Sequence, residues 1–152
     1  MGVREARGRK PMASIDAPRR GAVKFLLLHH TACTGGGFHY RVSKEGVVAP
    51  MLAESLRGQH PSSIAVAVAG DFDNALPSEA QLAALRDLLL RLKRRYPAVE
   101  LGAHRQVRRA KKTTCPGRRF PMRELAAWWR DEMPRMRDAA FAREFEEQYS
   151  KI

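Results

Sequence analysis

Cysteine and long apolar runs are both scarce in this chain of 152 residues. Its two cysteines, Cys33 and Cys115, are too few for a disulfide scaffold and too far apart for a CxxC motif, so each is expected to be a free thiol or a ligand. No apolar stretch approaches the roughly 20 residues that span a bilayer, and the N-terminal segment lacks the apolar run of a secretory signal. We therefore expect a protein that is made in the cytoplasm and stays there unless another factor releases it.

Acidic residues are outnumbered, because 28 lysines and arginines face 16 aspartates and glutamates, for a formal charge of +12. Such an excess attracts polyanions, among them nucleic acid, anionic lipid and the phosphate-bearing polymers of a bacterial envelope. Nucleic acid is not the expected partner, because the chain has no identifiable base-reading motif. The length suits one compact domain that buries about two thirds of the surface of its unfolded form.

Hydrophobic patterning predicts a set of short strands and one clearly delimited helix. Ser78 and Gln81 form a capping box, and leucines recur at helical spacing from there to about Tyr96. Glycine-containing turns separate the apolar runs that precede this helix. The expected strands are 22–30, 38–42, 47–49, 63–70 and 99–104.

A further helix is expected after Pro121 and should end or kink at Pro134, where a charged amphipathic helix follows. Strands with interposed and trailing helices predict the α/β class, with a mixed central β-sheet flanked by helices. The chain is expected to comprise a flexible basic arm at 1–21, a folded domain at 22–133 and a C-terminal amphipathic helix at 134–152.

Three possible metal ligands stand at the ends of predicted elements. His29 closes the first strand, His104 closes the last one, and Cys115 follows in a basic loop. Two imidazoles and a thiolate leave one tetrahedral position open, which is the pattern of a catalytic zinc site. Spacing alone does not single out this triple, because five histidines offer many others.

Six segments of the chain carry a family resemblance: LLLHHTA, FHYRVSKEGVV, SIAVAVAGDFD, PSEAQLAALRDLLLRLKRRYP, LGAHRQV and TTCPG. In this order, from about Phe25 to Trp129, they resemble type-2 N-acetylmuramoyl-L-alanine amidases. That fold is shared by phage lysozyme-type amidases and peptidoglycan recognition proteins. The resemblance implies an amidase/peptidoglycan-recognition-like fold and a zinc amidase domain at 22–133.

The resemblance also implies a reaction and its site. His29, His104 and Cys115 match the family's ligands for Zn2+. The implied reaction is hydrolysis of the amide bond between N-acetylmuramic acid and L-alanine in peptidoglycan, with peptidoglycan or a muropeptide as the substrate. A wall hydrolase without a signal implies a phage endolysin or prophage relative released by a holin-type route, or a bacterial cytosolic recycling amidase.

Three further residues are candidates for catalysis. Charge that develops on the substrate oxygen needs a nearby donor or cation, and Thr113 and Lys112 just before the cysteine are the candidates. The resemblance implies this role for the residue two before the cysteine, which is Thr113. His60 precedes the central strand, where phage-type relatives carry a histidine near the metal.

Three departures from the family separate this chain from its relatives. Phe38 stands where the family usually has a tyrosine that helps orient water, and Tyr40, on the same strand face, matches an ordinarily structural position. Only eight residues separate His29 from Phe38, which leaves no room for the helix that forms one wall of the substrate groove. The loop from His104 to Cys115 is also longer than usual and strongly basic.

For several other residues we expect a structural role rather than a role in metal binding or catalysis. His30 points away from the face of His29 and is expected to pack with a hydrogen bond, and His39 is expected to be a half-buried strand residue. Cys33 is expected to be a small free thiol without a function. The alternative is a disulfide between Cys33 and Cys115, which would abolish metal binding. The basic loop is either solvated surface or a means of attracting anionic cell-wall polymers.

Two alternatives to an enzyme stay open. A non-catalytic peptidoglycan-binding or regulatory module of the same fold agrees with Phe38 and with the missing groove wall. All three predicted ligands are nevertheless present, whereas family members that only bind commonly lose a ligand. Nucleic-acid binding is the other alternative, and it is suggested by charge alone.

Overall fold

The computed structural model describes residues 22–33, 35–108 and 112–149. The predicted arm at 1–21 lies outside the described residues. The chain divides into two compact units, one that ends at Phe120 and one that begins at Pro121. No helix within the described ranges combines the length and the hydropathy that crossing a membrane requires.

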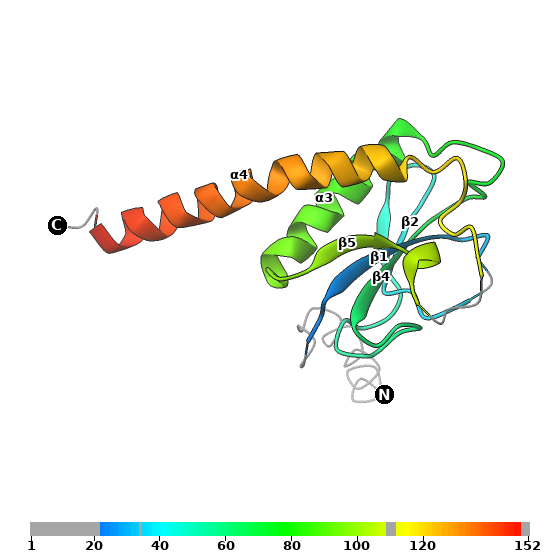
Figure 1. The fold of residues 1–152 in the computed structure, drawn as a ribbon, viewed down its shortest axis with the longest axis horizontal. Helices are drawn as coiled ribbons and strands as arrows, with labels where there is room; N and C mark the ends of the chain where they lie inside the picture. Colours follow the sequence, from blue (N-terminus) through cyan, green and yellow to red (C-terminus); the bar gives the residue numbers. More distant parts are fainter. Residues whose placement is uncertain (1–21, 34, 109–111, 150–152) are drawn as a thin grey trace, which may run out of the picture. The chain divides into compact units, whose positions relative to one another are not determined.

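A five-stranded mixed sheet forms the centre of the first unit (Figure 1). Its strands follow the order β3-β2-β4-β1-β5. β1 runs parallel to β4 and β5, and β2 runs parallel to β4 and antiparallel to β3. The predicted α/β class with a mixed central sheet is therefore confirmed. The strands are β1 (Phe25–His30), β2 (Tyr40–Val42), β3 (Val48–Pro50), β4 (Ser63–Val68) and β5 (Glu100–Ala103).

β1 and β4 are buried on both faces, which is typical of central strands in a covered parallel sheet. Their paired residues include Leu28 with Val66 and His29 with Ala67. The apolar run of β1 ends at Leu28, and His29, which follows it, is 0 % exposed.

α3 (Glu79–Arg95) connects β4 to β5 and lies behind the sheet in Figure 1, in contact with β2 and β3. The predicted capping box is present, because the Ser78 hydroxyl accepts from the Gln81 amide and the Gln81 side chain accepts from the Ser78 amide. Gln81 also donates to the Ala69 carbonyl at 2.8 Å, which ties the start of α3 to the end of β4. The buried leucines are Leu85, Leu88, Leu89 and Leu92.

The strand ends differ from the predicted ones by up to three residues, and two further differences concern His104 and Pro134. β5 ends at Ala103, so His104 does not close a strand but opens a short 3-10 helix, η1 (His104–Gln106), where the Gln106 side chain accepts from the Ala103 amide. In the second unit, α4 (Met122–Tyr149) continues through Pro134, so of the two predicted outcomes, an end or a kink, the helix does not end there. Proline removes one hydrogen bond of an interior turn, and the good helix formers on both sides carry the helix past it.

A buried carboxylate joins the loop after β3 to the end of α3. Glu54 is 0 % exposed. It accepts hydrogen bonds from the hydroxyls of Tyr40 and Tyr96, the latter at 2.6 Å, and from Arg95 Nη1 at 2.8 Å. Burial raises the pKa of the Tyr40 phenol, and the hydrogen bond to Glu54 raises it further. No local sequence pattern marks Glu54 for this role.

Replacing Glu54 with glutamine is expected to lower the free energy of unfolding by about 1–3 kcal/mol. The glutamine side chain has the shape of glutamate but lacks the negative charge that faces Arg95. Its amide NH2 would also point a donor at one of the three groups that now donate to Glu54. Urea unfolding followed by circular dichroism measures the change. The matched control is Glu45→Gln in the exposed turn before β3, which should change stability by less than about 0.5 kcal/mol. Equal effects of the two variants would contradict the proposed importance of this network.

Candidate metal centre

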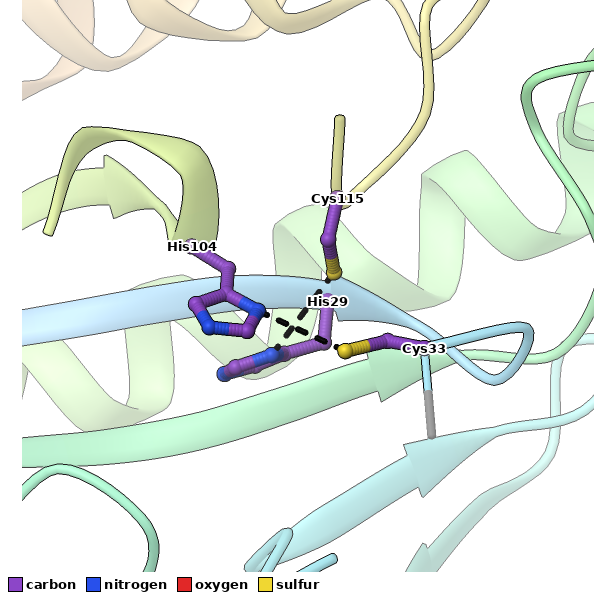
Figure 2. Close-up of side chains that lie close together, drawn as sticks. All are labelled: His29, Cys33, His104 and Cys115. Carbon is purple, nitrogen blue, oxygen red and sulfur yellow. Dashed lines mark hydrogen bonds between the residues drawn. The ribbon is translucent and has the colours of Figure 1, made fainter. Parts of the chain in front are cut away.

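Four side chains from separate parts of the first unit converge at the carboxyl end of β1. His29, Cys33, His104 and Cys115 each present one ligand atom, and these atoms lie within 4.8 Å of one another. Figure 2 shows the two imidazoles and two sulfurs facing a common centre. The structure thus brings together the three predicted ligands and adds Cys33, which sequence analysis left outside the ligand set.

Two close approaches within the cluster pair a nitrogen with a sulfur. His29 Nδ1 lies 3.8 Å from Cys115 Sγ, and His104 Nδ1 lies 3.5 Å from Cys33 Sγ. The rings of His29 and His104 are 4.6 Å apart between centroids. Imidazole nitrogen and thiolate sulfur are donors that zinc prefers, so the residues present fit this metal.

The sheet topology explains why distant residues meet here. β1 and β5 are adjacent and parallel, so their carboxyl ends lie at the same edge of the sheet, where ligands of α/β proteins commonly bind. His29 leaves β1 at that edge, and His104 follows β5 directly. The Arg105 amide donates to the Cys115 carbonyl at 2.9 Å and so holds the cysteine loop beside η1.

The loop that carries Cys115 is held by the segment after β4. Asp73 accepts from the Thr114 hydroxyl and from the Arg118 amide, both at 2.9 Å. These two bonds lower the pKa of the Asp73 carboxyl, the bond from Arg118 more than the bond from Thr114. Gly117 packs against Phe72 so closely that an added Cβ would lie 2.4 Å from the Phe72 carbonyl carbon.

His30 supports the same cysteine from the backbone of β1. Its amide donates to Cys115 Sγ at 3.4 Å, while its ring Nδ1 accepts from the Phe72 amide at 3.0 Å. The predicted packing role of His30 agrees with this bond. His39 is fully buried rather than half-buried: its Nε2 donates to the Leu56 carbonyl, and its Nδ1 accepts from the Ala65 amide.

Electrostatics favour the neutral forms of the clustered groups. The pKa of His29 is lowered to about 3, first by burial and then by His104 and His60. Burial also lowers the pKa of His104 and raises the pKa of the Cys115 thiol to about 12. Neutral imidazoles keep a lone pair available for a metal, and a bound cation would reverse the penalty on the thiolate.

Two further rings border His29. The ring of His60 stacks on His29 at 5.9 Å and lies 4.9 Å from that of His104, while Phe38 lies 5.0 Å from His29. Nε2 of His29 and Nε2 of His60 are buried and have no hydrogen-bond partner within the part of the chain that the structure describes. Because Tyr40 donates to Glu54, its hydroxyl is committed to the fold, and Phe38 occupies the place beside the cluster.

The other two predicted catalytic residues lie just before the cysteine. The Thr113 hydroxyl accepts from the Cys115 amide at 3.1 Å, so it shapes the turn that presents the sulfur. Lys112 is exposed. The roles of Thr113, Lys112 and His60 in a reaction stay predictions.

Comparisons with solved structures find related folds. The N-acetylmuramoyl-L-alanine amidase LysC from Clostridium intestinale URNW matches with a TM-score of 0.63 and 23 % identity, over 72 % of this chain and 87 % of LysC. Drosophila PGRP-LB matches with a TM-score of 0.57 and 20 % identity, over 73 % and 84 % of the two chains. The Ph2119 endolysin from a Thermus scotoductus bacteriophage matches with a TM-score of 0.54 and 26 % identity, over 66 % and 81 %.

Comparison with curated protein sequences finds no match. The sequence profile described as N-acetylmuramoyl-L-alanine amidase, in contrast, matches residues 19–118, a range that includes the whole sheet and all four clustered residues. The fold and this profile lead to the same assignment: the chain belongs to the N-acetylmuramoyl-L-alanine amidase family.

Proposed function

We propose that the protein is a zinc-dependent peptidoglycan amidase that hydrolyses the bond between N-acetylmuramic acid and L-alanine. The convergence of His29, His104 and Cys115 at one edge of the sheet is the observation that carries this proposal. These residues would hold Zn2+, with imidazole and thiolate donors that suit this metal. Zinc at this site would polarise the amide carbonyl and provide a nucleophile from water near neutral pH.

The residues around the cluster have distinct tasks in this reaction. His60 Nε2 is buried without a partner and faces the cluster, so it can hold a proton of the attacking water or pass one to the leaving amine. Thr113 accepts from the Cys115 amide and still has its own hydroxyl hydrogen to donate to the charge that develops on the carbonyl oxygen. Lys112 adds a positive charge close to Thr113.

The relatives support the choice of substrate. LysC is named an amidase, Ph2119 is named an endolysin, and a PGRP-LB mutant was solved in complex with tracheal cytotoxin. We propose peptidoglycan or a muropeptide as the substrate of this chain, with synthesis in the cytoplasm and access to the wall after release. Phe38 beside His29 favours the second candidate, a module that binds peptidoglycan without cleaving it, because a phenyl ring has no hydroxyl to orient water.

Purified protein distinguishes the two candidates in one experiment. Zinc content is measured by elemental analysis, and release of soluble stem peptides from purified cell walls is followed by chromatography. Zinc with new N-terminal alanine supports the amidase. Zinc with wall binding but no released peptide supports the binding module, and absence of zinc from protein refolded in excess metal rejects the zinc amidase.

Association with the wall is expected to weaken as salt rises, about tenfold between roughly 0.05 and 0.5 M NaCl, because salt screens the reach of exposed charge. The exposed basic residues Arg108 and Arg118 flank the cysteine in sequence. Sedimentation with purified walls measures binding. The double change of Arg108 and Arg118 to serine should flatten the salt response. Arg94→Ser at the far end of α3 is the control and should leave the salt response unchanged. Identical responses of the double variant and the control would contradict a role for Arg108 and Arg118.

A further inference from the structure

Cys33 occupies a place in the cluster that the family resemblance does not assign. Its sulfur is one of the four ligand atoms that lie within 4.8 Å of one another. It lies 3.5 Å from Nδ1 of His104, whereas Cys115 Sγ lies 3.8 Å from Nδ1 of His29. Figure 2 shows these two pairs side by side, with the lines that join them crossing in this view.

The spacing matches a tetrahedral site with two nitrogens and two sulfurs. Zinc–nitrogen bonds of about 2.0–2.1 Å and zinc–sulfur bonds of about 2.3 Å, at tetrahedral angles, put nitrogen and sulfur about 3.6 Å apart. The two nitrogen–sulfur distances in the cluster, 3.5 Å and 3.8 Å, lie on either side of this value. These two nitrogen–sulfur pairs therefore already stand at the separation that a shared zinc ion requires, and all four ligand atoms lie within 4.8 Å of one another.

The backbone places Cys33 in the cluster by specific hydrogen bonds. The Cys33 amide donates to the His30 carbonyl at 3.0 Å, which closes a tight turn directly after β1. The Thr31 and Ala32 amides donate to the carbonyls of Val68 and Gly70, and the Thr31 hydroxyl accepts from the Gly70 amide at 2.9 Å. Because the turn is bonded to the end of β4, Cys33 is presented to the cluster in advance of any ligand.

We propose that Cys33 is a fourth zinc ligand, so that the resting site is closed by two histidines and two cysteines. This inference rests on the proposed zinc amidase and adds to it a resting state in which no position is free for water or substrate. Opening the site breaks the bond between the metal and Cys33 Sγ. The sulfur leaves with both bonding electrons as a thiolate and takes up a proton from solvent, so no oxidant or reductant takes part.

Cys33 is the ligand most suited to leave. It is half-buried, whereas His29, His104 and Cys115 are buried. Of the glycines that follow it, Gly36 has open space where a Cβ would lie, whereas Gly35 and Gly37 pack against Gln59. A half-buried ligand that is followed by glycines can move aside with less disturbance of the sheet than a ligand at the end of β1.

Counting sulfur ligands tests the proposal without reference to activity. Zinc-loaded full-length protein and the Cys33→Ala variant are examined by X-ray absorption at the zinc edge, and by the intensity of thiolate charge-transfer bands after loading with cobalt(II). We expect two sulfurs in the unchanged protein and one in Cys33→Ala, with one metal ion still bound per chain. Ala32→Ser, in the same turn, is the control and should keep two sulfurs.

The outcomes separate this proposal from the proposed function. One sulfur in the unchanged, zinc-loaded protein overturns the ligand role of Cys33 and leaves the zinc amidase standing. Failure of the unchanged protein to take up zinc overturns both. A Cys33–Cys115 disulfide in zinc-loaded protein, detected by mass spectrometry, also overturns the fourth-ligand assignment. Because the count in the unchanged protein is decisive, the test holds even if Cys33→Ala does not fold.

Discussion

Replacing Cys115 with alanine is expected to remove the bound zinc and to lower amide hydrolysis by about 1,000-fold or more. Cys115 is 0 % exposed and its sulfur accepts from the His30 amide, so the fold holds this ligand in place. Cys115 is buried, whereas Cys33 is half-buried, so Cys115→Ala removes a firmly held ligand and with it the affinity and the electrostatic help that the metal supplies to the reaction. Elemental analysis and release of stem peptides from purified walls measure the two losses.

Cys115→Asp is the matched control for this prediction. A carboxylate also ligates zinc, so this variant should retain zinc where Cys115→Ala does not. His29→Ala should have the same effect as Cys115→Ala, because it removes another buried ligand of the cluster. Full hydrolysis by either alanine variant would contradict the assignment of these ligands. Circular dichroism of each variant separates loss of metal from loss of fold.

Gly117→Ala is expected to have the second large effect, although it changes no ligand atom. Gly117 has φ of 118°, which residues with a side chain rarely adopt, and an added Cβ would meet the backbone of Phe72. Backbone strain of this kind costs on the order of 1–3 kcal/mol. Relief of the clash requires the loop that carries Cys115 to move away from Phe72. Zinc affinity is therefore expected to fall by about 10–100-fold, the usual effect of losing a supporting contact behind a ligand.

Competition with a chromogenic chelator measures the affinity, and thermal unfolding measures the stability. Gly36→Ala is the control, because an added Cβ at Gly36 has no neighbour within 4 Å and the φ of Gly36 lies outside the left-handed region. Both quantities should stay close to their original values in Gly36→Ala. A Gly117→Ala protein that binds zinc as tightly as the Gly36→Ala protein would show that the loop position does not depend on this contact.

The sequence predicted those parts of the fold that local patterns determine. The capping box at Ser78 and Gln81 defines the start of α3 because its hydrogen bonds join residues only three positions apart. The apolar runs of β1 and β4 are recognisable because both faces of these strands are buried. The continuation of α4 past Pro134 was left open between an end and a kink, since tolerance of a proline depends on the residues around it rather than on the proline alone.

In the candidate site, the sequence predicted only those residues that lie in the family motifs. The convergence of His29, His104 and Cys115 followed from the resemblance, whereas their spacing in the chain was insufficient. Cys33 was missed because its approach to His104 depends on a turn that is bonded to β4, far away in the sequence. Glu54 was missed for a similar reason, since its partners come from β2 and α3.

The composition of β1 has a consequence for how the centre forms. FLLLHH changes little when it slips by one position: leucine replaces leucine, and His30 replaces His29. In a strand that is buried on both faces, the hydrophobic pattern does not determine the register of pairing with its neighbours. Bonds at its ends must therefore do so, chiefly those of Thr31 with Val68 and Gly70. The threonine after the paired imidazoles thus helps to determine which of them faces the other ligands.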